Sequence, residues 1–268
     1  MGSRFVPRPG RDLSMLLFEP PPSQGDLHFR VLGIPVRVHP FFWVGAVILG
    51  ISGRDGTPPA DLIIWIAVVL VSILVHELGH ALTQRRFGGT PWITLHSFGG
   101  LASCSDCDRS PRSQILISLA GPAAGFALAA VVVAFLAALG RFKGFELSFI
   151  PVTWELFDLG YAREHQRLSP RDLVVWDLLQ VNILWGLINL LPIYPLDGGQ
   201  VTREVCSLSN PRQGIITSLR ISTAAGVAMA VVGLVAMGSV FTALMFGYLA
   251  YTSYRALQAY QSHQPSGW

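Results

Sequence analysis

The sequence has little charge. Only 13% of its 268 residues are Asp, Glu, Lys or Arg, whereas 51% are apolar. A soluble globular domain carries about a quarter charged residues, so roughly half of an ordinary charged surface is missing. The mean hydropathy of +0.49 is too high for a disordered chain or a protein that coats nucleic acid. These values exclude the soluble and secreted classes of protein.

Cysteine is also scarce, which excludes a disulfide framework. Of the three cysteines, Cys104 and Cys107 form a single CxxC pair, and Cys206 stands alone. A zinc knuckle needs a second such pair, and the sequence contains none. We therefore expect Cys104 and Cys107 to be free thiols in a loop that faces a reducing cytoplasm, rather than a redox or metal site.

What the sequence does have is long apolar stretches with charges at their ends. A helix needs about 20 residues to cross a bilayer. The last stretch has 34 residues, and Gly238-Ser239 near its middle favours two helices there. We expect an all-α polytopic membrane protein with about six transmembrane helices. The apolar stretches are 39–53, 62–82, 113–140, 173–194 and 221–254.

The positions of the Lys and Arg residues predict the orientation. With a cytoplasmic N-terminus, 13 of the 19 fall on the cytoplasmic side and 6 on the other. The positive-inside rule then places both termini in the cytoplasm. The formal net charge of +3 is therefore a topology signal and does not indicate a nucleic-acid partner.

The polar segments suggest a division of the chain. HFRVLGIPVRV at 28–38 mixes β-branched residues with Arg30 and Arg37, which is typical of an interfacial strand and predicts a small membrane-associated β element. We expect a flexible Arg- and Pro-rich cytoplasmic arm, a core, a pair of C-terminal transmembrane helices and a short tail. Their bounds are 1–27, 28–205, 206–257 and 258–268.

The chemistry is concentrated in the second apolar stretch, which contains His76-Glu77-Leu78-Gly79-His80. Histidines at i and i+4 share one helix face, so both imidazoles can reach one metal ion. Glu77 can then hold a water bound to that ion. Ionisable residues inside a transmembrane segment indicate function, and here three occur within five residues. A satisfied polar cluster between helices is the structural alternative.

A zinc ion held by two histidines needs a third protein ligand. We favour Asp197, because the fourth stretch ends near the same membrane depth as His76. Pro192 and Pro195 break that helix, so we expect Asp197 on a non-helical segment with two glycines beside it. A role in capping a turn is the alternative for Asp197. Chemically possible rivals in a loop are His96, Asp106 and Asp108.

Two further polar residues lie in the fourth stretch. Asn182 and Asn189 are seven positions apart and share a helix face. For Asn182, a hydrogen bond between helices and a contact to substrate are equally good interpretations. Asp177 lies near the outer interface, where we expect a structural role.

Three motifs in order, HELGHAL, SLAGPAAGF and NLLPIYPLDGG, resemble the site-2 protease family of intramembrane zinc metalloproteases. The resemblance covers roughly residues 28–205. It implies one Zn²⁺ bound by His76, His80 and Asp197, with Glu77 as the catalytic base. It also implies that Asn189 helps to position the substrate or the oxyanion.

The same resemblance concerns two other segments. Ala120-Gly121-Pro122 matches the Gly-Pro signature of the third helix, and residues 92–102 resemble a sheet-forming insert. The edge of that insert could pair with an unwound substrate by strand addition. The chain resembles a compact form that lacks the PDZ or cystathionine-synthase-type domain of other members.

The implied activity is hydrolysis of peptide bonds in the transmembrane segments of single-span proteins. The resemblance implies an integral protein of a prokaryotic cell (inner) membrane, with the bilayer as a partner and the active site towards the cytoplasm. Two alternatives stay open. One is a non-proteolytic zinc-binding membrane protein or transporter, which would not need Glu77, and the other is a zinc hydrolase that acts on lipid.

Overall fold

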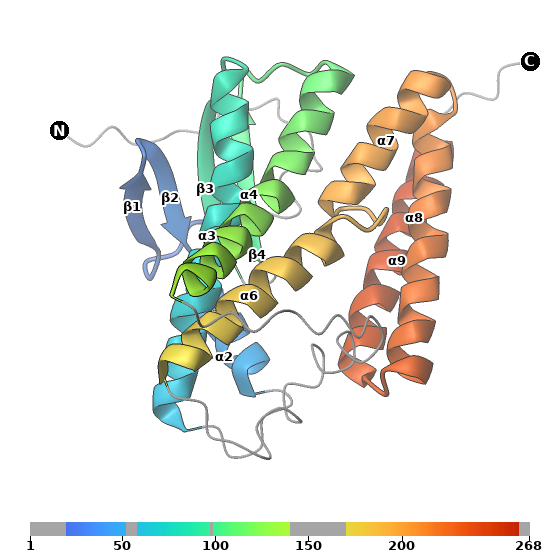
Figure 1. Ribbon diagram of the computed structural model, residues 1–268. Coiled ribbons are helices and arrows are strands. Elements are labelled where there is room, and N and C mark those ends of the chain that lie inside the picture. Colours follow the sequence, from blue (N-terminus) through green and yellow to red (C-terminus); the bar gives the residue numbers. More distant parts are fainter. Residues whose placement is uncertain (1–19, 52–57, 97–98, 140–169, 263–268) are drawn as a thin grey trace, which may run out of the picture.

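The computed structural model describes residues 20–51, 58–96, 99–139 and 170–262 (Figure 1). Most of the expected arm 1–27 and of the loop 141–171 lie outside these residues. Within them, helices predominate and one small sheet is present, as expected. The helices are α2 (Pro40–Ile51), α3 (Pro59–Arg86), α4 (Pro111–Ala138), α6 (Pro170–Asn189), α7 (Asp197–Ser209), α8 (Gly214–Val231), the π-helical segment η2 (Val232–Ala236) and α9 (Val240–Ser262).

Helix α3 is the centre of the molecule. Pro59 stands at its first position, where the missing N–H costs nothing. The helix continues for 28 residues and stops where Gly88 adopts a φ of 83°. Helices α4 and α6 and the last two strands of the sheet all pack against it, so the HELGH segment lies in the interior.

The sheet has the order β1-β2-β3-β4. Its strands are β1 (Leu27–Val31), β2 (Ile34–Val38), β3 (Thr90–His96) and β4 (Gly99–Ser105). The β1–β2 and β3–β4 pairs are antiparallel, and β2 runs parallel to β3. The connection from β2 to β3 therefore passes through α2 and α3, as a parallel pair requires.

The prediction of a single strand over 28–38 is wrong. Residues Leu32 and Gly33 both have positive φ, 51° and 80°, and they form a two-residue turn between β1 and β2. Positive φ at both central residues suits the twist of a hairpin. Leu32 continues the apolar composition of the strands into the turn, so the composition of 28–38 hides it.

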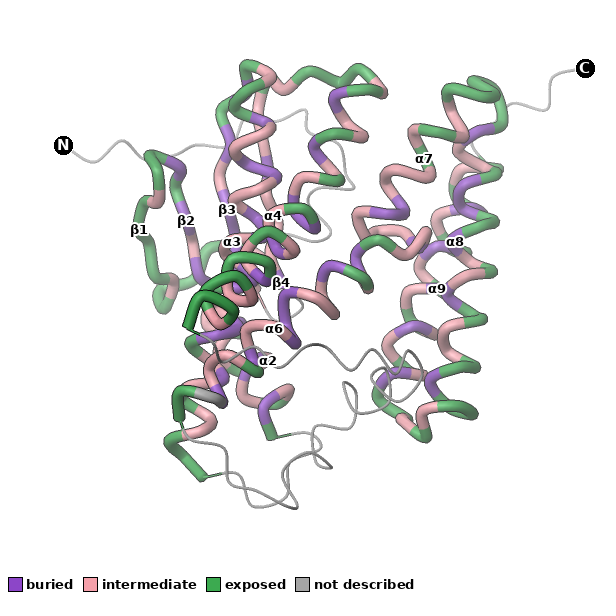
Figure 2. The backbone as a smooth tube through the Cα atoms, viewed as in Figure 1, coloured by how far each residue is buried: buried purple, intermediate pink, exposed green. Residues whose placement is uncertain are grey.

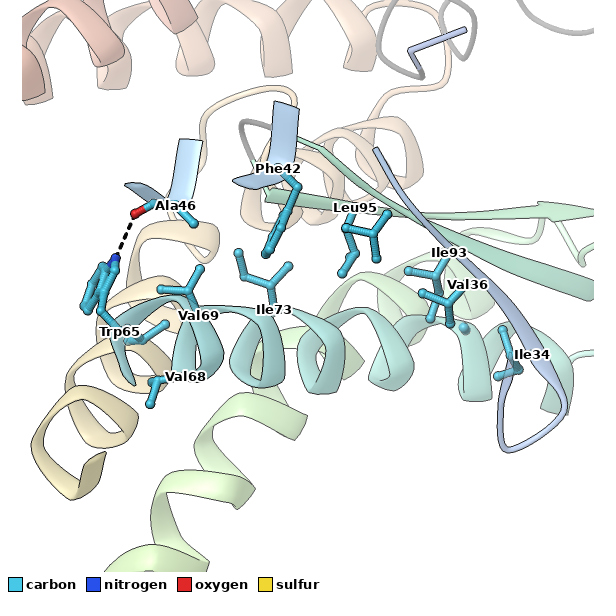
Figure 3. Close-up of a cluster of buried hydrophobic side chains, with 13 residues drawn as sticks. Ile34, Val36, Phe42, Ala46, Trp65, Val68, Val69, Ile73, Ile93 and Leu95 are labelled. Carbon is cyan, nitrogen blue, oxygen red and sulfur yellow. Dashed lines mark hydrogen bonds between the residues drawn. The ribbon is translucent and has the colours of Figure 1, made fainter. Parts of the chain in front are cut away.

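An apolar core joins the sheet to α2 and α3 (Figure 3). Alternate residues of β2, namely Ile34, Val36 and Val38, are buried because successive side chains of a strand point to opposite faces. Trp65 of α3 donates its indole N–H to the carbonyl of Ala46, at 3.0 Å. This core fixes the sheet against α3, which carries the HELGH segment and is called the metal helix below.

The second part of the molecule consists of α7, α8 and α9. Helix α7 contacts α4 on one side and α8 on the other, and α8 packs along α9. The last apolar stretch is broken between η2 and α9, so two helices form there, as expected. Outward-facing residues of both helices are exposed (Figure 2), which fits contact with lipid.

Among the residues that the structure describes, three helices are long and apolar enough to span a membrane: α3, α4 and the segment Gly214–Ala236. Two shorter apolar helices are Pro40–Ile51 and Leu173–Asn189. The chain is a membrane protein, and the count of about six spans stays a prediction. Helix α6 ends at Asn189 rather than near Tyr194, because the prolines at 192 and 195 cannot continue the backbone ladder.

Candidate metal centre

Two histidines of α3 provide the base of the site. His76 and His80 are one helical turn apart, and both are buried. Their Nε2 atoms lie 3.2 Å from each other. The i, i+4 spacing therefore brings the two ring nitrogens together, as expected.

Asp197 completes the cluster. One carboxylate oxygen lies 3.2 Å from Nε2 of His76, and the other lies 3.4 Å from Nε2 of His80. Among the described residues, these three form the group of potential metal ligands, with ligand atoms within 4.8 Å of one another. Sequence spacing alone could not establish this contact, because 117 positions separate His80 from Asp197.

The backbone before Asp197 folds closely around it. A Cβ on Gly198 would lie 2.1 Å from the carbonyl oxygen of Leu190, and one on Gly199 would lie 2.5 Å from the carbonyl carbon of Ile193. The two glycines are thus needed for close approach, as predicted. The expectation that Asp197 lies on a non-helical segment is wrong in one respect: Asp197 is the first residue of α7.

The arrangement of these atoms fits a tetrahedral zinc ion. Ligands about 2.0–2.1 Å from one tetrahedral ion lie about 3.4 Å apart. The two Nε2 atoms lie 3.2 Å apart, and each lies 3.2 or 3.4 Å from one of the two carboxylate oxygens of Asp197. The carboxylate oxygen of Asp197 nearest His76 is buried and has no hydrogen-bond donor. Two imidazole nitrogens and a carboxylate that converge in a buried place are the donor set that zinc prefers, so the residues present fit the metal.

Helix α4 orients His80 from the opposite side. Nδ1 of His80 lies 2.7 Å from the carbonyl oxygen of Ile117, so Nδ1 carries the proton and Nε2 is left to bind metal. A Cβ on Gly121 would lie 2.2 Å from Nε2 of His80. One on Gly79 would lie 2.3 Å from the carbonyl oxygen of Ala120. The Ala-Gly-Pro segment is therefore the wall against which the metal helix packs.

Glu77 is buried beside the cluster, with 4% of its surface exposed. Strand β4 covers it. A Cβ on Gly100 would lie 2.3 Å from Cγ of Glu77, and the backbone N–H of Ala102 donates to the carboxylate. Glu77 is thus held near the two histidines without joining their ligand triangle, which is the arrangement that a general base requires.

The remaining candidates lie elsewhere. Asn189 is the last residue of α6, and its amide donates to the carbonyl of Trp185 at 2.8 Å, so its role in the reaction stays a prediction. His96 ends β3 opposite Gly99. Asp108 accepts hydrogen bonds from Ser110 at the start of α4. Asp106 has a φ of 61° in the turn after β4. The ligand group contains none of the three rivals.

Two buried polar residues of α6 have structural surroundings. Asn182 donates to the hydroxyl of Ser72 in α3, at 2.9 Å, and to the carbonyl of Leu178 in its own helix, at 2.8 Å. This geometry favours the interpretation of Asn182 as a link between helices. Asp177 is fully buried, which agrees with a structural role.

The expectation of free thiols at 104 and 107 is wrong in this structure. Cys104 and Cys107 are joined by a disulfide. The turn that contains Asp106 brings their Cα atoms to 6.0 Å, within the range that a disulfide spans. Cys206 is the free cysteine.

No motif in the sequence identifies Gln84, yet this residue contacts the strand that covers the site. It lies one turn after His80 and is 8% exposed. Its side-chain amide donates to the carbonyl of Ala102 at 3.0 Å. The available signal is positional: residue 84 continues the i, i+4 row of His76 and His80.

Known proteins share these features. A family model described as peptidase family M50 matches residues 64–233. The Rip3 protein of Mycobacterium tuberculosis is 32% identical over 189 residues, which are 65% of this chain and 42% of Rip3. Zinc metalloprotease MJ0392 of Methanocaldococcus jannaschii is 25% identical over 213 residues, 76% of this chain and 51% of that protein. This chain spans about half the length of these relatives.

A solved structure agrees in fold. The site-2 protease from Methanocaldococcus jannaschii superimposes with a TM-score of 0.55 at 22% sequence identity, over 87% of this chain and 95% of that one. The family model covers more than half of the chain, including the HELGH segment, the Ala-Gly-Pro segment and Asp197. The chain belongs to peptidase family M50, the family of the site-2 proteases.

Proposed function

We propose that this protein is an intramembrane zinc metalloendopeptidase that hydrolyses peptide bonds in the transmembrane segments of other membrane proteins. The observation that carries the proposal is the convergence of His76, His80 and Asp197 beside a buried Glu77. Three ligands leave the fourth position of a tetrahedral ion for water. A transporter would need ligands but no such base.

The protein's residues divide the reaction between them. His76, His80 and Asp197 would hold one zinc ion, which supplies Lewis acidity and a bound water of lowered pKa. Glu77 would take the proton of that water and deliver it to the leaving amine. Asn189 would orient the substrate near the scissile bond. The substrate helix would have to unwind locally, because the carbonyls of an intact helix are engaged in its own hydrogen bonds.

The placement in the cell is also part of the proposal. We infer about six spans in a prokaryotic cell membrane, with both termini and the site towards the cytoplasm. The distribution of Lys and Arg supports this orientation. The core 28–205 would carry the chemistry, and the helices of 206–257 would complete the membrane domain between the arm 1–27 and the tail 258–268.

A test of the proposal uses Glu77→Gln. Purified protein in detergent is loaded with zinc and incubated with a panel of single-span model substrates, with and without a chelator. Glu77→Gln should retain one zinc per chain and lose cleavage, because the amide cannot accept the proton. Glu204→Gln, the same change on α7, is the control and should cleave at the wild-type rate. Cleavage by zinc-loaded Glu77→Gln would refute the assigned role.

A further inference from the structure

The edge strand β4 carries an unusual pair of contacts. In an antiparallel pair, residues alternate between those that exchange both backbone hydrogen bonds and those that exchange none. Pro91 lies opposite Cys104 and has no N–H, so this pair cannot be of the bonded type. The alternation then makes Ile93 and Ala102 a non-bonded pair as well. The N–H and C=O of Ala102 therefore point away from β3.

Both of these groups form hydrogen bonds with residues of the metal helix. The N–H of Ala102 donates to the carboxylate of Glu77, and its C=O accepts from the side-chain amide of Gln84 at 3.0 Å. Glu77 and Gln84 are seven positions apart, so they lie two turns apart on one face of α3. Ala102 is thus held through both of its backbone polar groups, the N–H of the 101–102 peptide and the C=O of the 102–103 peptide, by the helix that carries the ligands.

Burial makes the two contacts interdependent. Glu77 is 4% exposed and Gln84 is 8% exposed, so water cannot readily replace either partner. Without the amide of Gln84, the carbonyl of Ala102 would be left without a partner, and a buried unsatisfied carbonyl is costly. Ala102 would shift to find one, and its N–H, which is joined to that carbonyl through the same Cα, would move away from Glu77.

We propose that Gln84 is a positioning residue for the proteolytic reaction, which acts through the backbone of Ala102 to hold the carboxylate of Glu77 in its productive orientation. The inference rests on the proposed function, because it assigns Gln84 to the base of that reaction. Gln84 itself touches neither the ligand cluster nor the reacting atoms. Its effect belongs to the chemical step and not to substrate binding.

Two substitutions interrupt this connection at different points. Gln84→Met keeps the length of the side chain and removes the donor. Ala102→Pro removes the N–H that reaches Glu77, and an edge strand tolerates proline where the N–H faces away from the sheet. Gln114→Met is the matched control, since it removes another glutamine-to-carbonyl hydrogen bond, to Asp108, on the exposed start of α4.

Each variant is assayed as full-length zinc-loaded protein in detergent, against a single-span substrate that the wild type cleaves. Gln84→Met should lower kcat about 10- to 100-fold, the usual effect of losing a partner behind a catalytic group, with KM within twofold. Zinc content should equal that of Gln114→Met, and Tm should fall by no more than the few degrees that one lost buried hydrogen bond costs. Ala102→Pro should show a similar loss, and the double variant should be no worse, because both changes break one connection.

Hydrogen–deuterium exchange of the segment 99–103 gives a readout that does not depend on activity. In Gln84→Met the amide of Ala102 should exchange at least about tenfold faster, whereas Gln114→Met should leave it unchanged. An unchanged exchange rate in Gln84→Met would overturn the proposal even if no substrate is ever cleaved. So would a raised KM with normal kcat, a parallel loss of zinc and Tm, or losses that multiply in the double variant.

Discussion

Replacement of Gly121 by Ala should strongly weaken metal binding without unfolding the protein. A Cβ at this position would lie 2.2 Å from Nε2 of His80 and 2.8 Å from Nε2 of His76. Non-bonded carbon atoms are at their best separation near 3.5–4.0 Å, so the His80 ring or α4 must move by at least about 1 Å. Zinc ligands tolerate about 0.2 Å, and the ligand triangle cannot absorb such a shift.

The expected magnitude has two parts of opposite sign. Displacing a ligand should weaken zinc binding at least about 100-fold, or about 2.8 kcal/mol. In the apoprotein, Ala in place of Gly in a helix interior favours the folded state by up to about 1 kcal/mol. The metal-free variant should therefore have nearly the same Tm as the metal-free wild type. Zinc should raise the Tm of the wild type but not that of the variant.

Gly125 provides the control, because it lies one turn further along α4. A Cβ there would lie 3.5 Å from the backbone and side-chain oxygens of Asn182, which is ordinary contact. Both variants are titrated with a chelator while bound zinc is measured, and Tm is recorded with and without metal. Gly125→Ala should bind zinc like the wild type. Equal zinc affinity in Gly121→Ala and Gly125→Ala would refute the steric argument.

Two more predictions concern polar and sulfur contacts outside the cluster. In a double-mutant cycle of Ser72→Ala and Asn182→Ala, the unfolding free energies should reveal a coupling of about 0.6 kcal/mol, typical of hydrogen bonds between membrane helices, with cleavage retained. A coupling near zero together with lost cleavage would instead indicate that Asn182 contacts substrate. Alkylation of the denatured protein without reductant should label Cys206 alone, and all three cysteines after reduction. Labelling of Cys104 and Cys107 without reductant would contradict the disulfide.

The metal cluster is the part of the site most visible in the sequence. His76, Glu77 and His80 interrupt an apolar run that a bilayer would not otherwise tolerate, so their chemistry stands out against the surrounding residues. Asp197 could be predicted as the third ligand because two prolines end the fourth stretch and two glycines stand beside Asp197. At these positions the residue types alone are enough to indicate a metal site.

Other features depend on geometry that no local pattern contains. The contact between Gln84 and Ala102 depends on the hydrogen-bonding phase of β4, which Pro91 determines from the neighbouring strand. The turn at Leu32 is hidden because leucine rarely adopts positive φ, so nothing but Gly33 marks it. The start of α7 at Asp197 was obscured by the glycines, which disfavour helix by propensity and are retained here for close packing.

The parallel pairing of β2 with β3 has a consequence for the order in which the molecule assembles. Val36 lies opposite Ile93, 57 positions later, and the chain between them contains the whole metal helix. At a synthesis rate of about 5–20 residues per second, the edge of β2 stays unpaired for several seconds until β3 has been synthesised. Each hairpin can form locally, but the two can pair only after α3 has been synthesised. The helix segment with His76 and His80 is therefore made before the sheet that covers Glu77 can be completed.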